Sequence, residues 1–388
     1  MMIKKPFLPF TKPCLSEESI AEVVDSLRSG WLTTGPKVKK FEGMLQEYLG
    51  CEKSVTALSS ATAGLYLSLT SLKIQPGDEV ITTSFTFVAT LNTIVQAGGK
   101  PVLVDVEKGT YNIDVSQIEG AITPRTKAIV PVHFAGAPVD LDPLYDIARR
   151  HNLHVIEDAA HAIGTEYKGQ KIGSFGDTQV FSFHPNKNIT TGEGGCVSSS
   201  DSDLIRNLST AKFHGIDRES WNRFSKEGSQ LYDVVTPGLK YNMMDLQAAL
   251  GLHQLPELDH FIDLRTKRVK NYLEAFHGWE ELSLPQVPAY SHRHAWDLFA
   301  PTLNSKKTGI SRDELIAKLK EENIGAGLHW QAPHLFSFYQ DTFGFKVGDF
   351  PNAEYIADHV LSLPLFPQMT DDEQSRVINA LKKILKKD

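Results

Sequence analysis

Apolar side chains recur at helical spacing near the start of the chain. Residues 16–29 predict a helix that begins after an N-cap at Ser16 and ends at Gly30. Its apolar stripe is expected to consist of Ile20, Val23, Val24 and Leu27. After a turn at 30–37, the spacing predicts a second helix that ends at Gly50. The buried face of this second helix is expected to carry Val38, Phe41, Leu45 and Leu49.

From residue 62 onward, short apolar runs alternate with helical patterns. Strands are predicted at 79–83, 101–105, 127–132, 153–157, 178–183 and 195–199. One helix is predicted before the first of these strands, at 62–73, and three more lie between the first four strands, at 87–97, 115–122 and 140–151. Strands that are apolar throughout are typical of parallel sheets with helices on both faces. The chain is therefore expected to be an α/β protein with a mostly parallel central sheet flanked by helices.

The second half of the chain has a different pattern. Residues 212–238 lack periodicity but contain several aromatic residues, so we interpret them as a lid or an arm that reaches another subunit. A long helix is predicted at 245–271, with the change of domain inside it. The expected units are a large domain, 1–255, and a small C-terminal α+β domain, 256–388. The small domain is expected to contain strands at 295–302 and 324–329 and helices at 312–322, 352–361 and 370–386.

Charge and composition narrow the classes of partner. The net charge of −7 gives no electrostatic reason to expect nucleic acid or an anionic membrane surface. No apolar stretch approaches the roughly 18 residues that a membrane-spanning helix needs. Cys14, Cys51 and Cys196 are odd in number and widely spaced, which favours reduced thiols in a cytoplasmic protein. No histidine has the ligand spacing of a zinc site, so no metal is expected.

A lysine and a carboxylate follow two of the predicted strands. The segment FSFHPNKNITTGEGG, residues 181–195, carries Lys187 from a strand end into a glycine-rich turn, and Asp158 follows the strand at 153–157. Parallel strands end at one edge of a sheet, where ligands of α/β folds bind. Such a pair suits pyridoxal phosphate, because the lysine forms a Schiff base with the aldehyde and the aspartate keeps the pyridine nitrogen protonated. A solvated loop lysine and a surface ion pair remain alternatives.

A third element favours a phosphate ligand. Ser60, Ala61 and Thr62 lie in a turn of small residues that leads into an apolar helix, where free amides and hydroxyls can hold an anion. Such turns are also common without a ligand. Neither a GxGxxG nor a GK[ST] motif occurs at a strand–helix junction, which argues against a dinucleotide site or a P-loop.

Several motifs occur in the order of a known family. They include SGWLTTGPKVKKFE, SSATAG, PVHFAGAPVDLD, VIEDAAHAIGT, FSFHPNKNITTGEGG, LKYNMMDLQAALGLHQL and LSLPLFPQMT. Together they resemble the DegT/DnrJ/StrS-type sugar aminotransferases, which are pyridoxal phosphate enzymes of the aspartate aminotransferase fold (fold type I). The runs KNIT, TPGLKYN, HAWDLF and SLPLFP are most similar to the branch that makes UDP-4-amino-4-deoxy-L-arabinose.

The resemblance implies roles for individual residues. The catalytic positions are Lys187, Asp158 and His161. The cofactor-binding positions comprise these three together with Ser60, Ala61, Thr62, Phe87, Ser182 and Asn242. In the family, the counterpart of Phe87 stacks on the pyridine ring and that of Asn242 reaches the phosphate from the partner subunit, which implies a homodimer with shared active sites. The sugar nucleotide is expected to contact Thr34, Gly35, His329 and Trp330.

The resemblance also implies a reaction. We expect the amino group of L-glutamate to pass to a nucleotide-linked 4-keto sugar, with 2-oxoglutarate as the keto acid product and a UDP-4-keto pentose as the leading substrate. A UDP- or dTDP-4-keto-6-deoxyhexose is the alternative. A sugar dehydratase or a non-catalytic regulator is less favoured, because Lys187 and Asp158 are both present. Asp297 and the pair Thr191-Gly192 depart from the arabinose branch, and both departures are expected to bear on the sugar and not on the cofactor.

Overall fold

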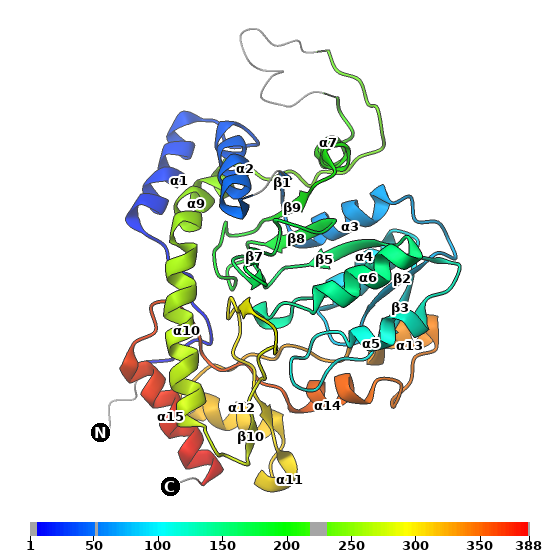
Figure 1. The fold of residues 1–388 in the computed structure, drawn as a ribbon. Coiled ribbons are helices and arrows are strands. Elements are labelled where there is room, and N and C mark those ends of the chain that lie inside the picture. Colours follow the sequence, from blue (N-terminus) through cyan, green and yellow to red (C-terminus); the bar gives the residue numbers. More distant parts are fainter. Residues whose placement is uncertain (1–5, 51–52, 218–230, 387–388) are drawn as a thin grey trace.

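A seven-stranded sheet forms the centre of the protein in the computed structural model, which describes residues 6–50, 53–217 and 231–386 (Figure 1). The strand order is β1-β9-β8-β5-β4-β2-β3. The strands are β1 (Ser54–Leu58), β2 (Glu79–Thr83), β3 (Lys100–Val104), β4 (Thr126–Val130), β5 (His154–Asp158), β8 (Thr178–Ser182) and β9 (Gly195–Ser199). All neighbours pair in parallel except β9, which is antiparallel to both β1 and β8. The predicted α/β class and mostly parallel sheet are confirmed, whereas β1 was not predicted.

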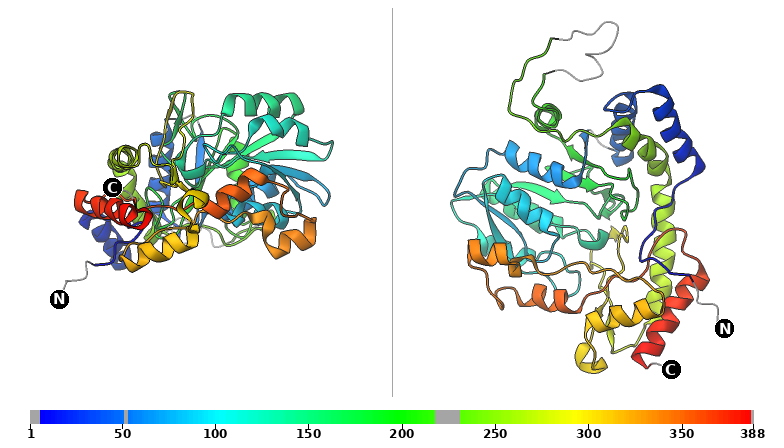
Figure 2. Two further views of the ribbon diagram at one scale, coloured as in Figure 1. Left: turned by 90° about the horizontal axis from the view of Figure 1, so that it is seen from below. Right: turned by 180° about the vertical axis from the view of Figure 1, so that it is seen from behind.

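Side chains that alternate along the strands enter two separate cores. On β5, Val155 packs into one hydrophobic cluster and Ile156 into another, and on β8 Phe181 and Val180 divide in the same way. The first core is covered by α2 (Pro36–Leu49) and α6 (Leu141–His151), the second by α3 (Ala61–Ser71), α4 (Val88–Gln96) and α7 (Ser202–Ala211). Figure 2 shows α3 and α4 on the face opposite to α6. This two-sided burial explains why the strands are apolar throughout.

The first two helices differ in how well their buried faces were predicted. In α2 the buried residues are Val38, Phe41, Leu45 and Leu49, and Gly50 ends the helix in the left-handed conformation, all as expected. Helix α1 (Glu17–Ser29) has the predicted N-cap, Ser16, but not the predicted face. Ser19 and Ser26 are buried, whereas Ile20 and Leu27 are 46% and 56% exposed. Small side chains face α9 (Asp245–Gln254), its main contact, because they allow close approach of the two helices.

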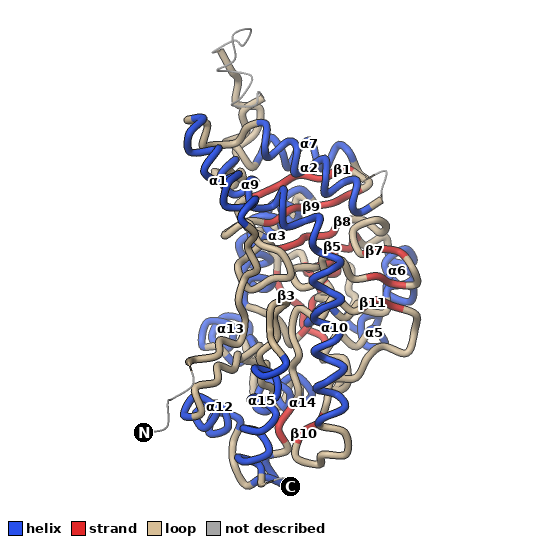
Figure 3. Tube along the Cα trace, turned by 90° about the vertical axis from the view of Figure 1, so that its left-hand side faces the viewer, coloured by secondary structure: helices blue, strands red, loops and turns tan. Residues whose placement is uncertain are grey.

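The predicted long helix at 245–271 is interrupted. A 3-10 turn at Leu255–Glu257, which contains Pro256, separates α9 from α10 (Leu258–Ala275). Proline lacks the amide that an α-helix would use at that point. Figure 3 shows α10 running from α1, α2 and α9 at one end to α15 at the other. The proposed domain limit at 255/256 falls at this turn and stays a prediction.

A separate hydrophobic cluster packs around the far half of α10. It includes Tyr272, Phe299 and Leu381, and the helices α12 (Arg312–Glu321) and α15 (Asp371–Leu385) contribute to it. Thr370 and Glu373 form a capping box at the start of α15. The helices α13 (Ser337–Phe343) and α14 (Pro351–His359) lie between α12 and α15 in the sequence, and α13 was not predicted.

The strands predicted at 295–302 and 324–329 are largely wrong. Within residues 256–386, which the structure describes, the strands are β10 (Leu282–Ser283), β11 (His292–Arg293) and β12 (Thr302–Leu303), each of two residues, with isolated bridges such as Phe299 to Leu363. The short strand β6 (Glu166–Tyr167) pairs with β11 on one side and with β7 (Gln170–Lys171) on the other. The remaining short helices are α5 (Val115–Ile118) and α11 (Ser305–Thr308).

The predicted lid or arm at 212–238 lies partly outside the described residues. Its described ends run side by side, with an antiparallel bridge between Ile216 and Val234, and they extend away from the sheet in Figure 1. Leu231 and Val235 are 81% and 61% exposed. The role of this segment stays a prediction. No helix among the described residues is long and apolar enough to cross a membrane.

Candidate active site

A cavity of about 350 Å³ opens at the carboxyl ends of β5 and β8. Its wall contains ten of the thirteen predicted site residues: Ser60, Ala61, Thr62, Phe87, Asp158, His161, Ser182, Lys187, His329 and Trp330. These residues come from positions as distant as Ser60 and Trp330 in the sequence. The sheet therefore brings together most of the chemistry that the motifs suggested.

Lys187 reaches the cavity from the loop between β8 and β9. The loop is closed at its base, where the Phe183 amide donates to the Gly194 carbonyl and the Thr191 amide donates to the Phe183 carbonyl. Asn188, buried beside the lysine, donates its side-chain amide to the Ala295 carbonyl at 2.8 Å. The Lys187 side chain is 12% exposed. Burial lowers the pKa of its amine, and the charges of Asp297 and Asp158 offset part of this effect.

Asp158 is the last residue of β5 and its carboxylate is held from two sides. The Thr90 hydroxyl donates to Oδ2 at 2.8 Å, and the Ala160 amide donates to Oδ1 at 3.2 Å. Thr86 supports Thr90 through a hydroxyl contact of 2.8 Å. Burial raises the pKa of Asp158, while these hydrogen bonds and the charge of Lys187 oppose the rise. Each oxygen keeps acceptor capacity toward the cavity.

Two of the histidines that line the cavity, His161 and His329, have lowered pKa values that favour the neutral ring. The Ala135 amide donates to Nδ1 of His161 at 3.2 Å, so the neutral ring carries its proton on Nε2. Burial lowers the pKa of His161 well below its usual range, and the nearby Lys187 adds to this effect. Burial and Lys187 also lower the pKa of His329 to about 4. Nδ1 of His329 lies 2.9 Å from the Ser362 hydroxyl.

The start of α3 forms an anion-binding end of the cavity. Ser60 is the N-cap and accepts the Ala63 amide at 3.1 Å. The first amides of a helix have no intrahelical acceptor, so those of Ala61 and Thr62 are available to an anion. This helix start lies directly on the sheet because Gly195 has no side chain: a Cβ there would lie 2.6 Å from the Ala61 nitrogen.

Aromatic rings form another part of the wall. Phe87 precedes α4 and is 55% exposed, which is unusual for so large an apolar side chain beside a cavity. Its ring centroid lies 6.3 Å from that of Trp330, which in turn lies 5.1 Å from the ring of His161. Trp330, which is expected to contact the sugar nucleotide, lines the cavity. An exposed ring of this kind offers a face to a flat ligand.

Three of the predicted site residues lie elsewhere in this chain. Asn242 donates to the Thr34 hydroxyl at 2.6 Å, and Thr34 donates to the Met243 carbonyl at 2.5 Å. Gly35 precedes α2, and a Cβ at Gly35 would lie 2.7 Å from Oδ2 of Asp245. Thr34, Gly35 and Asn242 therefore do not line the cavity of their own chain. Their predicted contacts with a ligand stay predictions.

Asp297 was expected to bear only on the sugar, yet it lies against Lys187. Its Oδ2 is 3.6 Å from Nζ of Lys187 and 3.6 Å from Nδ1 of His161. It is 3% exposed and is absent from the cavity wall. The HAWD run gave one signal, a charged residue among apolar neighbours, but 110 positions separate Asp297 from Lys187 (297 − 187) and no local pattern links them.

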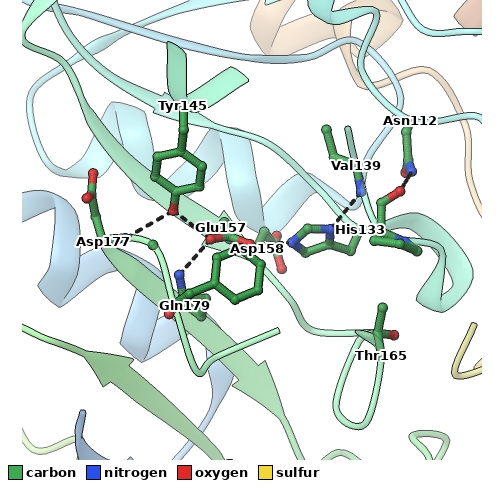
Figure 4. A network of polar contacts seen from close by, with 12 residues as sticks. Asn112, His133, Val139, Tyr145, Glu157, Asp158, Thr165, Asp177 and Gln179 are labelled. Atoms are coloured by element: carbon green, nitrogen blue, oxygen red, sulfur yellow. Dashed lines mark hydrogen bonds and ion pairs between the residues drawn. The ribbon is translucent and has the colours of Figure 1, made fainter. Parts of the chain in front are cut away.

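A second buried carboxylate lies behind the site, on the other face of β5 (Figure 4). Glu157 is 1% exposed and accepts hydrogen bonds from His133 at 2.8 Å, from Tyr145 at 2.7 Å and from Gln179 at 2.6 Å. The Val139 amide donates to Nδ1 of His133, so the His133 proton lies on Nε2 and points to Glu157. Burial by itself would raise the pKa of Glu157, but the hydrogen bonds outweigh it and the pKa lies below its usual value.

The cavity residues fit the predicted cofactor, pyridoxal phosphate. The amides at the start of α3 suit the phosphate, the exposed Phe87 ring suits the pyridine face, and the carboxylate of Asp158 suits a protonated ring nitrogen. Lys187 supplies the amine that an aldehyde requires. Among the residues that the structure describes, no group of three or more His, Cys, Asp or Glu side chains is arranged to hold a metal ion.

Comparisons with known proteins identify the family of the chain. The model of the DegT/DnrJ/EryC1/StrS aminotransferase family matches residues 13–382. An uncharacterized protein of Methanocaldococcus jannaschii, MJ1066, is 49% identical over 99% of this chain and 99% of its own length. The spore coat polysaccharide biosynthesis protein SpsC of Bacillus subtilis is 46% identical over 98% of this chain and 97% of its own length.

Solved structures are similar over nearly the whole chain. Spr1654 of Streptococcus pneumoniae, described as a sugar aminotransferase, superposes in its PLP-form with a TM-score of 0.88 at 32% identity and covers 99% of both chains. PseC of Helicobacter pylori, an aminotransferase involved in the biosynthesis of pseudoaminic acid, has a TM-score of 0.90 at 28% identity, with 98% of this chain and 99% of PseC covered.

Proposed function

The chain belongs to the DegT/DnrJ/EryC1/StrS aminotransferase family, and from this premise we propose that it transfers the amino group of L-glutamate to a nucleotide-linked 4-keto sugar. At the coarser level it is a sugar aminotransferase that uses pyridoxal phosphate. The observation that carries the proposal is the meeting of Lys187 and Asp158 in one cavity with the start of α3. A lysine, a buried carboxylate and an anion site are together what the cofactor requires.

Lys187 has the central role in the proposed reaction. The cofactor, when bound, supplies an aldehyde and an electron-withdrawing ring that acidifies the α carbon of an attached amino acid. Nζ of Lys187 removes the proton from the α carbon of glutamate and later returns a proton to the sugar carbon that receives the amine. Its lowered pKa favours this role, because more of the amine is then unprotonated near neutral pH.

The other cavity residues bind and orient. Asp158 holds a proton on the ring nitrogen, and Thr90 fixes the carboxylate that does so. The amides of Ala61 and Thr62, with Ser182, hold the phosphate. His161 is neutral and presents its Nε2 proton, so it orients ligands as a hydrogen-bond donor without adding a charge. Glutamate and the keto sugar use this one site in turn, which predicts a ping-pong scheme.

His329 and Trp330 are the proposed contacts of the sugar nucleotide, because both line the cavity on the side of Phe87. A UDP-4-keto pentose is the leading substrate, and a UDP- or dTDP-4-keto-6-deoxyhexose is the alternative. The relative SpsC, a spore coat polysaccharide biosynthesis protein, supports a product that is used for a surface polysaccharide.

We also infer a homodimer with shared active sites. The bonded pair Asn242 and Thr34 lies outside the cavity of its own chain, which leaves both residues available to the site of a partner subunit. Mixing inactive Lys187→Ala protein with inactive Asn242→Ala protein, followed by subunit exchange, should restore up to about a quarter of the activity in hybrid dimers. Absence of any recovery after demonstrated exchange would contradict shared sites.

The function is tested by absorbance spectroscopy and product analysis. The purified protein should show the visible band of bound pyridoxal phosphate, and L-glutamate should shift it to the shorter-wavelength band of the aminated cofactor. Subsequent addition of a keto sugar from a panel of UDP- and dTDP-linked 4-keto pentoses and 6-deoxyhexoses should reverse the shift and yield the amino sugar. Absence of a visible band, or release of a dehydrated sugar, would overturn the proposal.

A further inference from the structure

Asp297 is a buried carboxylate without hydrogen bonds. Both of its side-chain oxygens are fully buried, and neither has a hydrogen-bond partner within the described part of the chain. Its nearest charged neighbour is the amine of Lys187, 3.6 Å from Oδ2, a distance that makes an ion pair without a hydrogen bond. Burying an ionised carboxylate in this way is costly unless the opposite charge stays close.

The backbone around Asp297 is held firmly in this position. Trp296 has a φ of 48°, in the left-handed region that bulky residues rarely adopt. Its ring stacks on His294 at 3.6 Å between centroids, and its amide donates to Nδ1 of His294. The Asp297 amide donates to the Ala135 carbonyl at 2.9 Å. A strained residue that is fixed from several sides often belongs to a functional site.

The helix α10 contributes a second cation. Arg265 is 1% exposed, and its Nη1 donates to the carbonyls of Trp296, Asp297 and Leu365 at 3.2–3.3 Å. Burial raises the pKa of Asp297. Lys187 lowers this pKa most among the neighbouring cations, and Arg265 and the more exposed His184 lower it by less. Arg265 thus fixes the backbone of Asp297 and leaves the carboxylate itself to Lys187.

The charges in this region balance only if a proton stays within it. With Lys187 and Arg265 protonated and Asp158 and Asp297 ionised, two positive and two negative charges make the group neutral as a whole. If the amine lost its proton to solvent, one uncompensated negative charge would remain buried. Nδ1 of His161 lies 3.6 Å from Oδ2 of Asp297 but accepts the Ala135 amide and carries no proton, so it cannot stabilise that charge as a donor.

We propose, on the basis of the function above, that Asp297 is a positioning residue that acts through Lys187, because the two side chains share one proton. In the resting pair the proton lies on the amine, and Lys187 is an ammonium ion beside a carboxylate. When Lys187 becomes a base, the two side chains close from 3.6 Å to hydrogen-bond distance, an N–H bond of Lys187 breaks and an O–H bond of Asp297 forms, so the total charge is unchanged. The reverse transfer returns the proton to the amine.

The directions of the pKa shifts agree with this exchange. Burial lowers the pKa of the Lys187 amine and raises the pKa of the Asp297 carboxyl, which brings the two values closer together. A purely structural acid in this protein has a different environment: Glu157 is equally buried but has three hydrogen-bond donors and a lowered pKa.

The test compares the wild-type protein with Asp297→Asn. The rate at which acetic anhydride modifies Lys187 in cofactor-free protein is measured against pH by peptide mass spectrometry, with an exposed lysine peptide as internal reference. Loss of the carboxylate charge should lower the midpoint of this profile by about one to three pH units, because the ammonium form loses its partner. In the holoenzyme, the pH titration of the visible band should move in the same direction.

The controls separate linkage from folding. Asp105→Asn removes an equally buried carboxylate that accepts the amides of Asn352 and Ala353 at the start of α14, and it should leave both profiles unchanged. Asp297→Glu keeps the charge and should restore part of the wild-type midpoint. If Asp297→Asn does not fold, Asp297→Ser is compared in its place.

The outcomes also separate this inference from the proposed function. Equal Lys187 midpoints in wild-type, Asp297→Asn and Asp297→Ser proteins would overturn the shared proton, whatever the enzyme transaminates. A lowered midpoint in a protein that fails to aminate any keto sugar would support the link between the two side chains and count against the proposed substrate.

Discussion

Glu157 and Asp158 are consecutive residues of one strand, yet their carboxylates lie in opposite kinds of environment. Successive side chains of a strand point to opposite faces of the sheet. Glu157 points to the face covered by α6, where His133, Tyr145 and Gln179 donate to it. Asp158 points to the cavity, where Thr90 and the Ala160 amide donate to it and Lys187 is close enough to affect its pKa.

The difference lies in the remaining acceptor capacity. The Glu157 carboxylate is enclosed by donors from three side chains, so it stabilises the fold and offers nothing to a ligand. Asp158 and Asp297 are less well satisfied and lie near a lysine whose charge can change. Buried charges that are fully paired are structural, whereas those that are partly paired are suited to chemistry. The following measurements test this contrast, from the largest expected effect to the smallest.

Lys187→Arg should reduce kcat about 10²- to 10⁴-fold, because arginine keeps the positive charge but cannot serve as the base. The free energy of unfolding should change little, since Lys187 lies in a loop and makes no side-chain hydrogen bond under 3.5 Å among the described residues. Glutamate half-reactions followed by stopped-flow absorbance measure the first quantity and urea denaturation the second. Lys127→Arg, at a lysine that is about half exposed, is the matched control. Turnover within tenfold of wild type would sink the assignment.

Glu157→Ala should lower the free energy of unfolding by about 3–5 kcal/mol, because it leaves three buried donors without an acceptor. Chemical denaturation measures the change, with Glu321→Ala on the exposed surface of α12 as the control. Below the unfolding transition, the visible band of the cofactor should resemble that of wild type. A loss of stability equal to that of the control would mean that the network is not structural.

Phe87→Ala should weaken the binding of pyridoxal phosphate by about fivefold, because stacking contacts of this kind contribute roughly 1 kcal/mol. Phe87 is 55% exposed, so the free energy of unfolding of cofactor-free protein should stay within about 0.5 kcal/mol of wild type. Equilibrium dialysis gives the affinity. Phe338→Ala, at a phenylalanine that is 51% exposed outside the cavity, should change neither quantity.

The pH dependence of unfolding should differ between the two environments. The folded pKa of Glu157 lies below the usual glutamate value of 4.5, so its contribution to stability is present above pH 4.5 and is lost as the pH falls through the folded pKa. The folded pKa of Asp158 lies above its usual 3.8, so its ionisation opposes folding as the pH rises through that range. The difference in free energy of unfolding between wild type and Glu157→Gln should therefore shrink as the pH falls below 4.5. Relative to Asp158→Asn, wild type should instead lose stability as the pH rises above 3.8.

Much of the fold was readable from local patterns. The buried face of α2, the N-cap of α1 and six of the seven sheet strands follow from apolar spacing and from single capping residues. The positions of Lys187 and Asp158 at strand ends follow from the same strands, and the family motifs assigned their expected roles. These features depend on neighbours within a few residues, and sequence reports such neighbours directly.

Long-range contacts decided what local patterns could not. Helix α1 turned Ser19 and Ser26 to the core because α9 packs closely against it, and the apolar stripe of α1 gave no indication of that partner. In the sequence, Asp297 is only a departure from a family motif. In the structure, Trp296 has a left-handed backbone conformation, and the carboxylate of Asp297 lies 3.6 Å from the amine of Lys187. The sequence by itself determined which residues have the chemistry for transamination. Only the tertiary structure decided which buried charges are left to share a proton, because that depends on every donor that surrounds them.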